Sequence, residues 1–347
     1  MNRFELSPDL KNLPVIYAEP WVQIAPGMVA PTMEGAAFDR QGNLLVCHRN
    51  RPWSNVVRIH PDKSFETIYH NDDAILIGVA IHKDGRIFLV DIDGKKLYEL
   101  SPEGKEQREL FSLCGHPIKA NDLAFDREGN LYVSEFEGDR NDPRGAIWRL
   151  EADSNYTAMN KIVGGLASPN GVAFSPDYSL LWTGETTRNC VTRIMLDEMG
   201  HLSRHFLAVH PTYQCIGFEV TDSNKADADG NIYTAMMYGG RVLVTNSVGV
   251  PIANVLLRDR EEGACMFSPN LAIKPGTKEG ILSLPARQAR GSTSSKRLPP
   301  AHRCSPKCDA NPLSDYSDCK GPYYELHCFK PLGGGQLHAG LRSEPPA

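Results

Sequence analysis

Four oxygen-bearing side chains recur at one position of an internal repeat, and together they could bind a hard metal ion. They are two carboxylates and two amides, namely Glu34, Asn121, Asn170 and Asp222. Single Asn and Asp residues before a strand are often only turn residues, so it is their common register that favours a shared site. Carboxylate and amide oxygens suit Ca²⁺, Mg²⁺ or Mn²⁺ better than zinc. Two carboxylates would also repel each other without a cation between them.

The repeated motif consists of two apolar residues, a polar residue, a turn rich in Asp, Gly and Asn, and a second apolar stretch. It occurs six times at intervals of 43 to 52 residues, with its third position at Asp39, His82, Asp126, Ser175, Asp227 and Lys274. Each copy predicts two β-strands joined by a tight turn. The interval is typical of one four-stranded propeller blade. Six unrelated hairpins in a sandwich are the alternative, and the even spacing argues against them.

The sequence therefore predicts an all-β, six-bladed β-propeller. The four site residues stand five residues before the third position of their motif, where the innermost strand of each blade is expected to begin. Quasi-symmetry brings such equivalent points together at one mouth of the central channel. The predicted metal site thus lies on the axis.

The C-terminal part of the chain departs from this pattern. Residues 285–347 are rich in Pro, Ser, Arg, Gly and Cys and show little strand alternation, which indicates low order. We expect residues 1–284 to form the propeller, with an incomplete sixth blade, and residues 285–347 to form a divergent, irregular tail. Residues 14–17 and 21–24 are candidates for closing strands, although they cannot replace the whole missing part.

Several motifs resemble one known family in their order and spacing over residues 15–280. They are Glu34-Gly35, Asn121-Asp122-Leu123, Ser168-Pro169-Asn170-Gly171 and Asp222-Ser223. They are similar to the family of gluconolactonases, regucalcin (senescence marker protein) and luciferin-regenerating enzymes. Within it, the chain most resembles the drug-responsive lactonases of staphylococci and their bacterial relatives.

The resemblance implies a lactone hydrolase with one divalent cation, for which Ca²⁺ is the first choice and Mg²⁺, Mn²⁺ and Zn²⁺ are alternatives. The matching positions in the family assign the ion to Glu34, Asn170 and Asp222, with Ser223 beside the last ligand. Asn121 and Asp122 match a pair that contacts metal or substrate. Asp222 also matches the position with the proton-transfer role.

Lactone hydrolysis needs a polarised carbonyl, a nucleophilic water and stabilisation of an oxyanion. A cation on the axis can bind the carbonyl oxygen and lower the pKa of a bound water. Asp222 would then take a proton from that water and return one to the leaving alkoxide. No Gly-x-Ser-x-Gly motif is present, so a serine nucleophile is not expected. His48, Arg49 and Arg51 follow the second strand of the first blade and could line the mouth of the channel, but we favour a solvated loop.

The composition of the chain excludes some classes of partner and predicts its location in the cell. The net charge is −5 and the pI about 6.1, so the chain as a whole does not attract nucleic acid or an anionic membrane. The sequence has no run of about 18 apolar residues that could span a membrane. A polar N-terminus without an apolar signal stretch and scattered cysteines predict a cytoplasmic protein.

Two other functions stay open at this point. The chain could be a non-catalytic propeller that binds a metal or a small ligand, since fold does not dictate function. It could also be a related hydrolase of aryl esters or organophosphates. The expected partner is a small lactone or ester, but the sequence identifies neither the lactone nor the oligomeric state.

Overall fold

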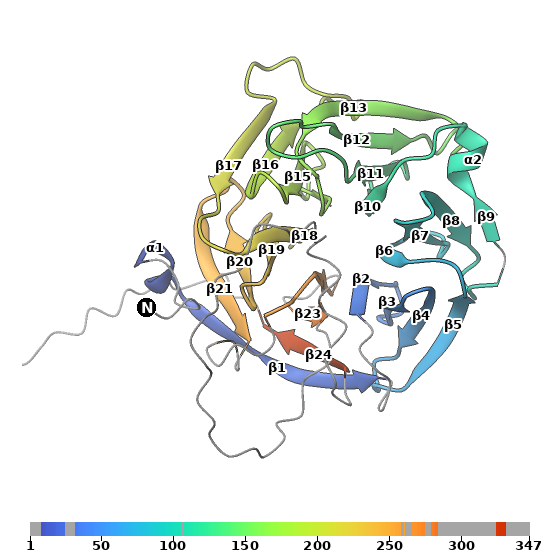
Figure 1. The fold of residues 1–347 in the computed structure, drawn as a ribbon, viewed down its shortest axis with the longest axis horizontal. Helices are drawn as coiled ribbons and strands as arrows, with labels where there is room; N and C mark the ends of the chain where they lie inside the picture. Colours follow the sequence, from blue (N-terminus) through green and yellow to red (C-terminus); the bar gives the residue numbers. More distant parts are fainter. Residues whose placement is uncertain are drawn as a thin grey trace, which may run out of the picture.

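The strands of the protein form a ring of sheets around a common centre (Figure 1). The computed structural model describes residues 8–24, 32–105, 107–257, 260, 266–274, 279–283 and 324–330. Within this part of the chain the only helices are the short α1 (Pro8–Lys11) and α2 (Leu110–Cys114). The predicted low-order tail lies outside the described residues, except for residues 324–330.

Four of the sheets have four antiparallel strands in chain order. The first two contain β2 (Thr32–Phe38), β3 (Leu44–Asn50), β4 (Trp53–Ile59) and β5 (Phe65–Asn71), then β6 (Leu76–Ile81), β7 (Ile87–Asp91), β8 (Lys96–Leu100) and β9 (Gln107–Glu109). The next two contain β10 (Ala120–Phe125), β11 (Leu131–Glu135), β12 (Gly145–Leu150) and β13 (Met159–Leu166), then β14 (Ala173–Phe174), β15 (Leu180–Glu185), β16 (Cys190–Met195) and β17 (Val209–Gln214). In the first three of them the first strand, β2, β6 or β10, lies nearest the centre (Figure 1).

The remaining strands form one continuous eight-stranded sheet, so the prediction of six blades is wrong. Its order is β18 (Val220–Ala226), β19 (Ile232–Met237), β20 (Arg241–Thr245), β21 (Pro251–Leu257), β1 (Val15–Ile24), β24 (Tyr324–Phe329), β23 (Gly280–Ser283) and β22 (Asn270–Ile273). The described residues thus form a propeller-like, all-β ring of four small sheets and one large sheet.

Strand β1 is the physical reason for this difference. Its first half, Val15 to Ala18, pairs in parallel with β21, and its second half pairs antiparallel with β24. Ten extended residues are long enough to serve two neighbours in succession, so hydrogen bonding runs without a break from β18 to β22. The N-terminal segment therefore supplies a closing strand, as expected. The composition of the tail did not predict β24.

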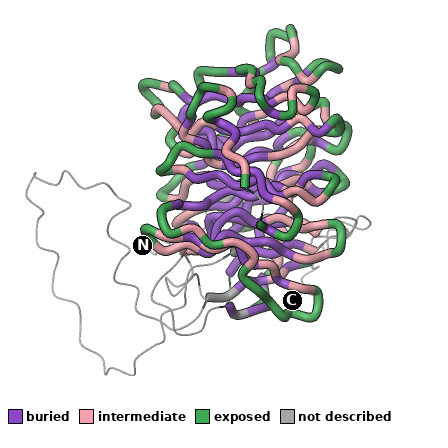
Figure 2. The backbone as a smooth tube through the Cα atoms, turned by 90° about the vertical axis from the view of Figure 1, so that its right-hand side faces the viewer, coloured by how far each residue is buried: buried purple, intermediate pink, exposed green. Residues whose placement is uncertain are grey.

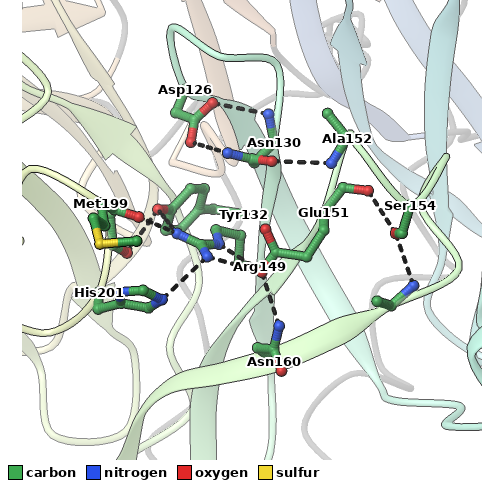
Figure 3. A network of polar contacts seen from close by, with 12 residues as sticks. Asp126, Asn130, Tyr132, Arg149, Glu151, Ala152, Ser154, Asn160, Met199 and His201 are labelled. Atoms are coloured by element: carbon green, nitrogen blue, oxygen red, sulfur yellow. Dashed lines mark hydrogen bonds and ion pairs between the residues drawn. The ribbon is translucent and has the colours of Figure 1, made fainter.

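The repeated motif folds as a turn that is clamped by its own aspartate (Figure 3). Asp126 accepts hydrogen bonds from the main-chain and side-chain nitrogens of Asn130, both at 2.8 Å. Gly129 takes a φ of 98°, which favours glycine. The Asn130 side chain then accepts from the main chain of Ala152 at 2.9 Å. The same Asp–Asn clamp recurs at Asp39–Asn43 and Asp227–Asn231.

Apolar side chains fill the spaces between adjacent sheets, and exposed residues gather on the loops at both faces of the disc (Figure 2). Between the second and third sheets, for example, Val90 and Phe88 pack in one cluster with Leu123 and Val133. Fully burying a side chain of this size stabilises the fold by about 1.5–3 kcal/mol. Face-to-face packing therefore holds the sheets around the centre.

The ring closes through packing of the eight-stranded sheet against the first sheet. Ala272, Ile281 and Leu326 lie in one apolar cluster with Leu44 and Val46. Strand β22 also contacts β2 directly at the centre. This closure depends on β24, which provides Leu326 and pairs with both β1 and β23.

Replacing Leu326 with alanine should lower the free energy of unfolding by about 2–5 kcal/mol, because the side chain is fully buried at the closure. Chemical denaturation measures the change. Lys330→Ala, at an 83% exposed side chain, is the matched control and should change stability by less than about 0.5 kcal/mol. A Leu326→Ala variant as stable as the control would show that β24 does not close the ring.

Candidate functional site

The innermost strands break their regular pairing where the predicted site residues stand. The register shifts between Glu34 and Ala36 in β2, and an equivalent shift occurs in β6. Residues 121–122 and 222–223 form the corresponding irregularities of β10 and β18. In the fourth sheet, residues 170–172 lie between an isolated bridge at Pro169 and the first ladder pair of β14 with β15. Such bulges re-aim side chains relative to the sheet, and here Glu34 and Asp222 come close enough for the charge of one to act on the other.

Hydrogen bonds tie these irregular segments to one another around the centre. Each joins one inner strand to the next, so the ring is held at its middle as well as by its outer packing. The bonds are Val172 N to Asp122 Oδ2 (3.2 Å), Gly171 N to Asp222 O (3.3 Å), Ser223 N to Pro269 O (3.3 Å) and Ala36 N to Asn270 Oδ1 (3.3 Å).

Glu34 and Asp222 are both buried and act on each other electrostatically. Burial raises the pKa of Asp222 well above its usual range, and the charges of Glu34 and Asp122 raise it further. Burial likewise raises the pKa of Glu34 from 4.5 to about 7, although the Arg49 guanidinium opposes the rise. The structure thus brings the two predicted carboxylates together in a site that disfavours their negative charges.

Asn170 adds an oxygen without a hydrogen-bond partner. Its side chain is buried and hydrogen-bonds the Asp222 carboxylate. Its Oδ1 is fully buried and accepts no hydrogen bond from any described residue. An unsatisfied buried acceptor costs about 1–3 kcal/mol, so this oxygen requires an explanation. Gly171 makes the arrangement feasible, since a Cβ there would come within 2.0 Å of Asn224 N on β18.

Asp122 is already neutralised by the protein. Its carboxylate accepts a hydrogen bond from Lys225 Nζ at 3.0 Å and others from the main chains of Leu123 and Val172. The aspartate is almost fully buried and bridges β10 to β18. Its oxygens serve the frame of the site, which disfavours the expected substrate contact.

Asn121 and Ser223 complete the predicted set. Asn121 is half-buried. Its main-chain carbonyl oxygen lies close to Gly78, and a Cβ built on Gly78 would be 2.6 Å from that oxygen. Ser223 is buried, and its Oγ accepts a hydrogen bond from Asn270 Nδ2 at 2.8 Å. Both residues therefore lie on the inner strands, with Ser223 engaged by the neighbouring strand β22.

Three further residues belong to this site, and the sequence pointed only to Arg49, as the less favoured of two interpretations. Arg49 lies in β3, and its Nη2 is 3.3 Å from Glu34 Oε1, so it is not part of a solvated loop. Lys225 and Asn270 hold Asp122 and Ser223. Lys225 follows Asp222 by three residues, and Asn270 stands at the start of the sixth copy of the motif. Neither residue type belongs to a motif that would have indicated a role in the site.

The donor set fits a hard divalent cation. Among the described residues no three His, Cys, Asp or Glu side chains are grouped as a metal site, so a cation here must also use amide oxygen. Asn170 Oδ1 is such an oxygen: it is buried, has no hydrogen-bond partner among the described residues, and belongs to a side chain bonded to Asp222, whose pKa is raised in part by Glu34. A cation would satisfy that acceptor and offset both negative charges.

A surface hollow of about 380 Å³ lies elsewhere and contains none of these residues. Its wall includes Arg86, Glu99 and Arg108 on the second sheet. Both guanidinium groups ion-pair with Glu99, so the polar groups of the hollow already have partners. We assign it no part in the chemistry of the centre.

Comparison with known proteins places this geometry in context. Residues 108–271 match the family model described as the SMP-30/gluconolactonase/LRE-like region. The chain is 34% identical over 276 residues to lactonase drp35 of Staphylococcus saprophyticus, which covers 78% of this chain and 83% of that protein. It is 32% identical over the same length to lactonase drp35 of Staphylococcus aureus, with the same coverage.

Solved structures show the same fold at low sequence identity. A luciferin-regenerating enzyme is 16% identical with a TM-score of 0.65, covering 92% of this chain and 96% of its own. A gluconolactonase of Xanthomonas campestris is 16% identical with a TM-score of 0.60, covering 77% and 95%. The calcium-binding protein regucalcin of Agrobacterium tumefaciens is 16% identical with a TM-score of 0.61, covering 90% and 95%. No helix among the described residues is long and apolar enough to cross a membrane.

Replacing Lys225 with methionine should lower the free energy of unfolding by about 3 kcal/mol, because Asp122 would keep a buried charge without its cation. The double variant Asp122→Asn, Lys225→Met removes both charges and should recover most of that loss. Denaturant titration of the single and double variants measures both. Equal stability of the single variant and the unchanged protein would contradict the assigned pair.

The stability of the chelated protein should fall as the pH rises from about 4.5 to 7. Burial raises the folded-state pKa of Glu34 to about 7, so its contribution is fully present below pH 4.5 and is lost as the pH passes 7. Glu34→Gln cannot lose a proton there and should show a shallower decline. Unfolding free energies in chelator across this range give both slopes, and parallel curves would contradict the assignment.

Proposed function

The chain belongs to the SMP-30/gluconolactonase/LRE-like family that includes lactonase drp35, and we propose that it hydrolyses a lactone at the centre of its ring with the help of one divalent cation. The observation that carries the proposal is the buried Asn170 Oδ1, which has no partner among the described residues and whose side chain bonds to Asp222, a carboxylate under the charge of Glu34. A related structure is named for lactone chemistry and another for calcium binding.

Glu34, Asn170 and Asp222 would hold the cation, for which Ca²⁺ is our first choice. Hard oxygen donors suit Ca²⁺, and Mg²⁺ or Mn²⁺ are the alternatives that this donor set favours over Zn²⁺. Asn121, on the neighbouring inner strand, is proposed to contact the ion or the substrate. Ser223 is a weaker ligand candidate, because its hydroxyl accepts a hydrogen bond from Asn270.

A cation in this place supplies electrostatic stabilisation of the negative charge that develops on the lactone carbonyl oxygen. Asp222 accepts a proton from the attacking water and later returns one to the alkoxide of the opened ring. Its burial and the nearby Glu34 charge make its carboxylate a better proton acceptor than an exposed aspartate. The Asn170 side chain, hydrogen-bonded to Asp222, keeps that carboxylate in place.

The Asp122–Lys225 ion pair connects inner strands next to the site and adds no net charge to it. It connects β10 to β18 across the strand that carries Asn170, so it fixes the spacing of the proposed ligands. The partner that we propose for this site is a small lactone or ester. The cytoplasmic location remains a prediction from the sequence.

The proposal predicts that purified protein opens lactones, loses this activity in chelator and regains it with one added cation. Replacing Asp222 with alanine should lower kcat/KM by at least about a thousandfold, because proton transfer and charge stabilisation are both lost. Asp153→Ala, at an exposed aspartate on the rim of the third sheet, is the control and should retain turnover. A panel of small lactones with pH-stat detection measures these rates.

Folded protein that opens no lactone with any of Ca²⁺, Mg²⁺, Mn²⁺ or Zn²⁺ would contradict the proposal. Circular dichroism and denaturation of each variant establish folding. Retained hydrolysis in Asp222→Ala would reject the role of that residue while leaving lactone hydrolysis itself in place.

A further inference from the structure

Arg49 reaches the proposed metal site from the end of the second strand of the first sheet. It lies in β3, where it pairs with Thr32 at the start of β2, and its guanidinium contacts Glu34. Its side chain is 21% exposed, so the protein covers it only in part. The guanidinium also lowers the pKa of Asp222, which places it within electrostatic reach of that carboxylate.

Much of the hydrogen-bonding capacity of Arg49 is unused. A guanidinium carries five N–H donors in a planar fork that matches a carboxylate. The contact to Glu34 uses only Nη2, at a long 3.3 Å. Nε is fully buried and has no acceptor among the described residues. A side chain present only to neutralise Glu34 would be expected to bind it through two short bonds, as Arg241 binds Glu219.

The charge balance of the site also leaves Arg49 in excess. Asp122 is neutralised by Lys225, and burial lowers the pKa of His48 to about 4, so His48 is neutral near pH 7. The carboxylates of Glu34 and Asp222 balance one divalent cation. With that cation bound, the charged groups that act on Asp222 and Glu34 leave one positive charge, on Arg49.

We propose that Arg49 binds a carboxylate on the substrate, so that the preferred lactones carry an anionic substituent beside the ring. This inference rests on the proposed function, because it specifies the substrate class of the same site. The terminal nitrogens of the planar guanidinium would receive the substrate carboxylate, while Nη2 keeps its contact with Glu34. Arg49 is thereby the residue that sets specificity, and Asp222 transfers protons.

A binding experiment tests this inference without turnover. The probes are tetrahydrofuran-2-carboxylate and its neutral carboxamide, two rings without an ester bond, titrated into Ca²⁺-loaded protein by calorimetry. The carboxylate should bind about tenfold more tightly than the amide, a difference of about 1.4 kcal/mol. In Arg49→Met this preference should disappear, and in Arg49→Lys it should be reduced, since a lysine keeps the charge but not the fork.

Arg51→Met is the matched control. Arg51 lies two residues away, is 65% exposed and pairs with Asp93, so its loss should leave the preference unchanged. Thermal unfolding of each variant shows that it is folded, and Arg49→Lys keeps the test valid if Arg49→Met does not fold. Equal binding of both probes to the unchanged protein would overturn the inference, as would a preference that survives in Arg49→Met and Arg49→Lys.

A kinetic arm separates this inference from the proposed function. A γ-butyrolactone with a carboxylate on the ring is compared with the corresponding carboxamide, and Arg49→Met should lower kcat/KM more for the former, by about tenfold. An equal loss for both substrates would overturn the inference. If no lactone is opened, the proposed function fails, while the calorimetric preference still decides whether Arg49 binds a carboxylate.

Discussion

The structure depends on one unfavourable interaction, the burial of two carboxylates near each other at the centre of the ring. Glu34 and Asp222 come from strands that are almost 190 residues apart in the chain, and burial raises the pKa of both. Water cannot screen them there, so the fold must hold them against their own repulsion. The side chain of Asn170 bonds to Asp222, and its amide oxygen has no hydrogen-bond partner among the described residues, so a bound cation would stabilise this arrangement.

The surrounding elements explain how these groups are held. Bulges at the inner strands turn the side chains toward the centre, and main-chain hydrogen bonds link one irregular segment to the next. The Asp122–Lys225 ion pair links β10 to β18 beside the site without adding net charge. Outside this belt, apolar packing between sheets keeps the strands in position, and β1 joins the last strands into one sheet that packs on the first.

The sequence was informative where the physics is local and repeated. The Asp–Asn turn clamps at residues 39, 126 and 227 recur because each turn uses the same short-range bonds, and the repeat that contains them placed Glu34, Asn121 and Asp222 in one register. It was misleading where long-range pairing decides. The double pairing of β1 depends on β21, about 240 residues away, and on β24, about 300 residues away, which no local composition reveals. For the same reason Lys225 was missed and Arg49 was assigned to a solvated loop, since each acquires its role only from a carboxylate on another strand.

The central claim is that Glu34, Asn170 and Asp222 form a cation site, and calorimetric titration of chelated protein with Ca²⁺ tests it most directly. We expect one ion per chain, with proton release at pH 6.5, because a carboxylate whose pKa is raised must lose its proton as the cation binds. Affinity should fall in Asn170→Ala, which leaves both carboxylates in place. The absence of binding, or binding that Asn170→Ala, Glu34→Gln and Asp222→Asn all leave unchanged, would contradict the account.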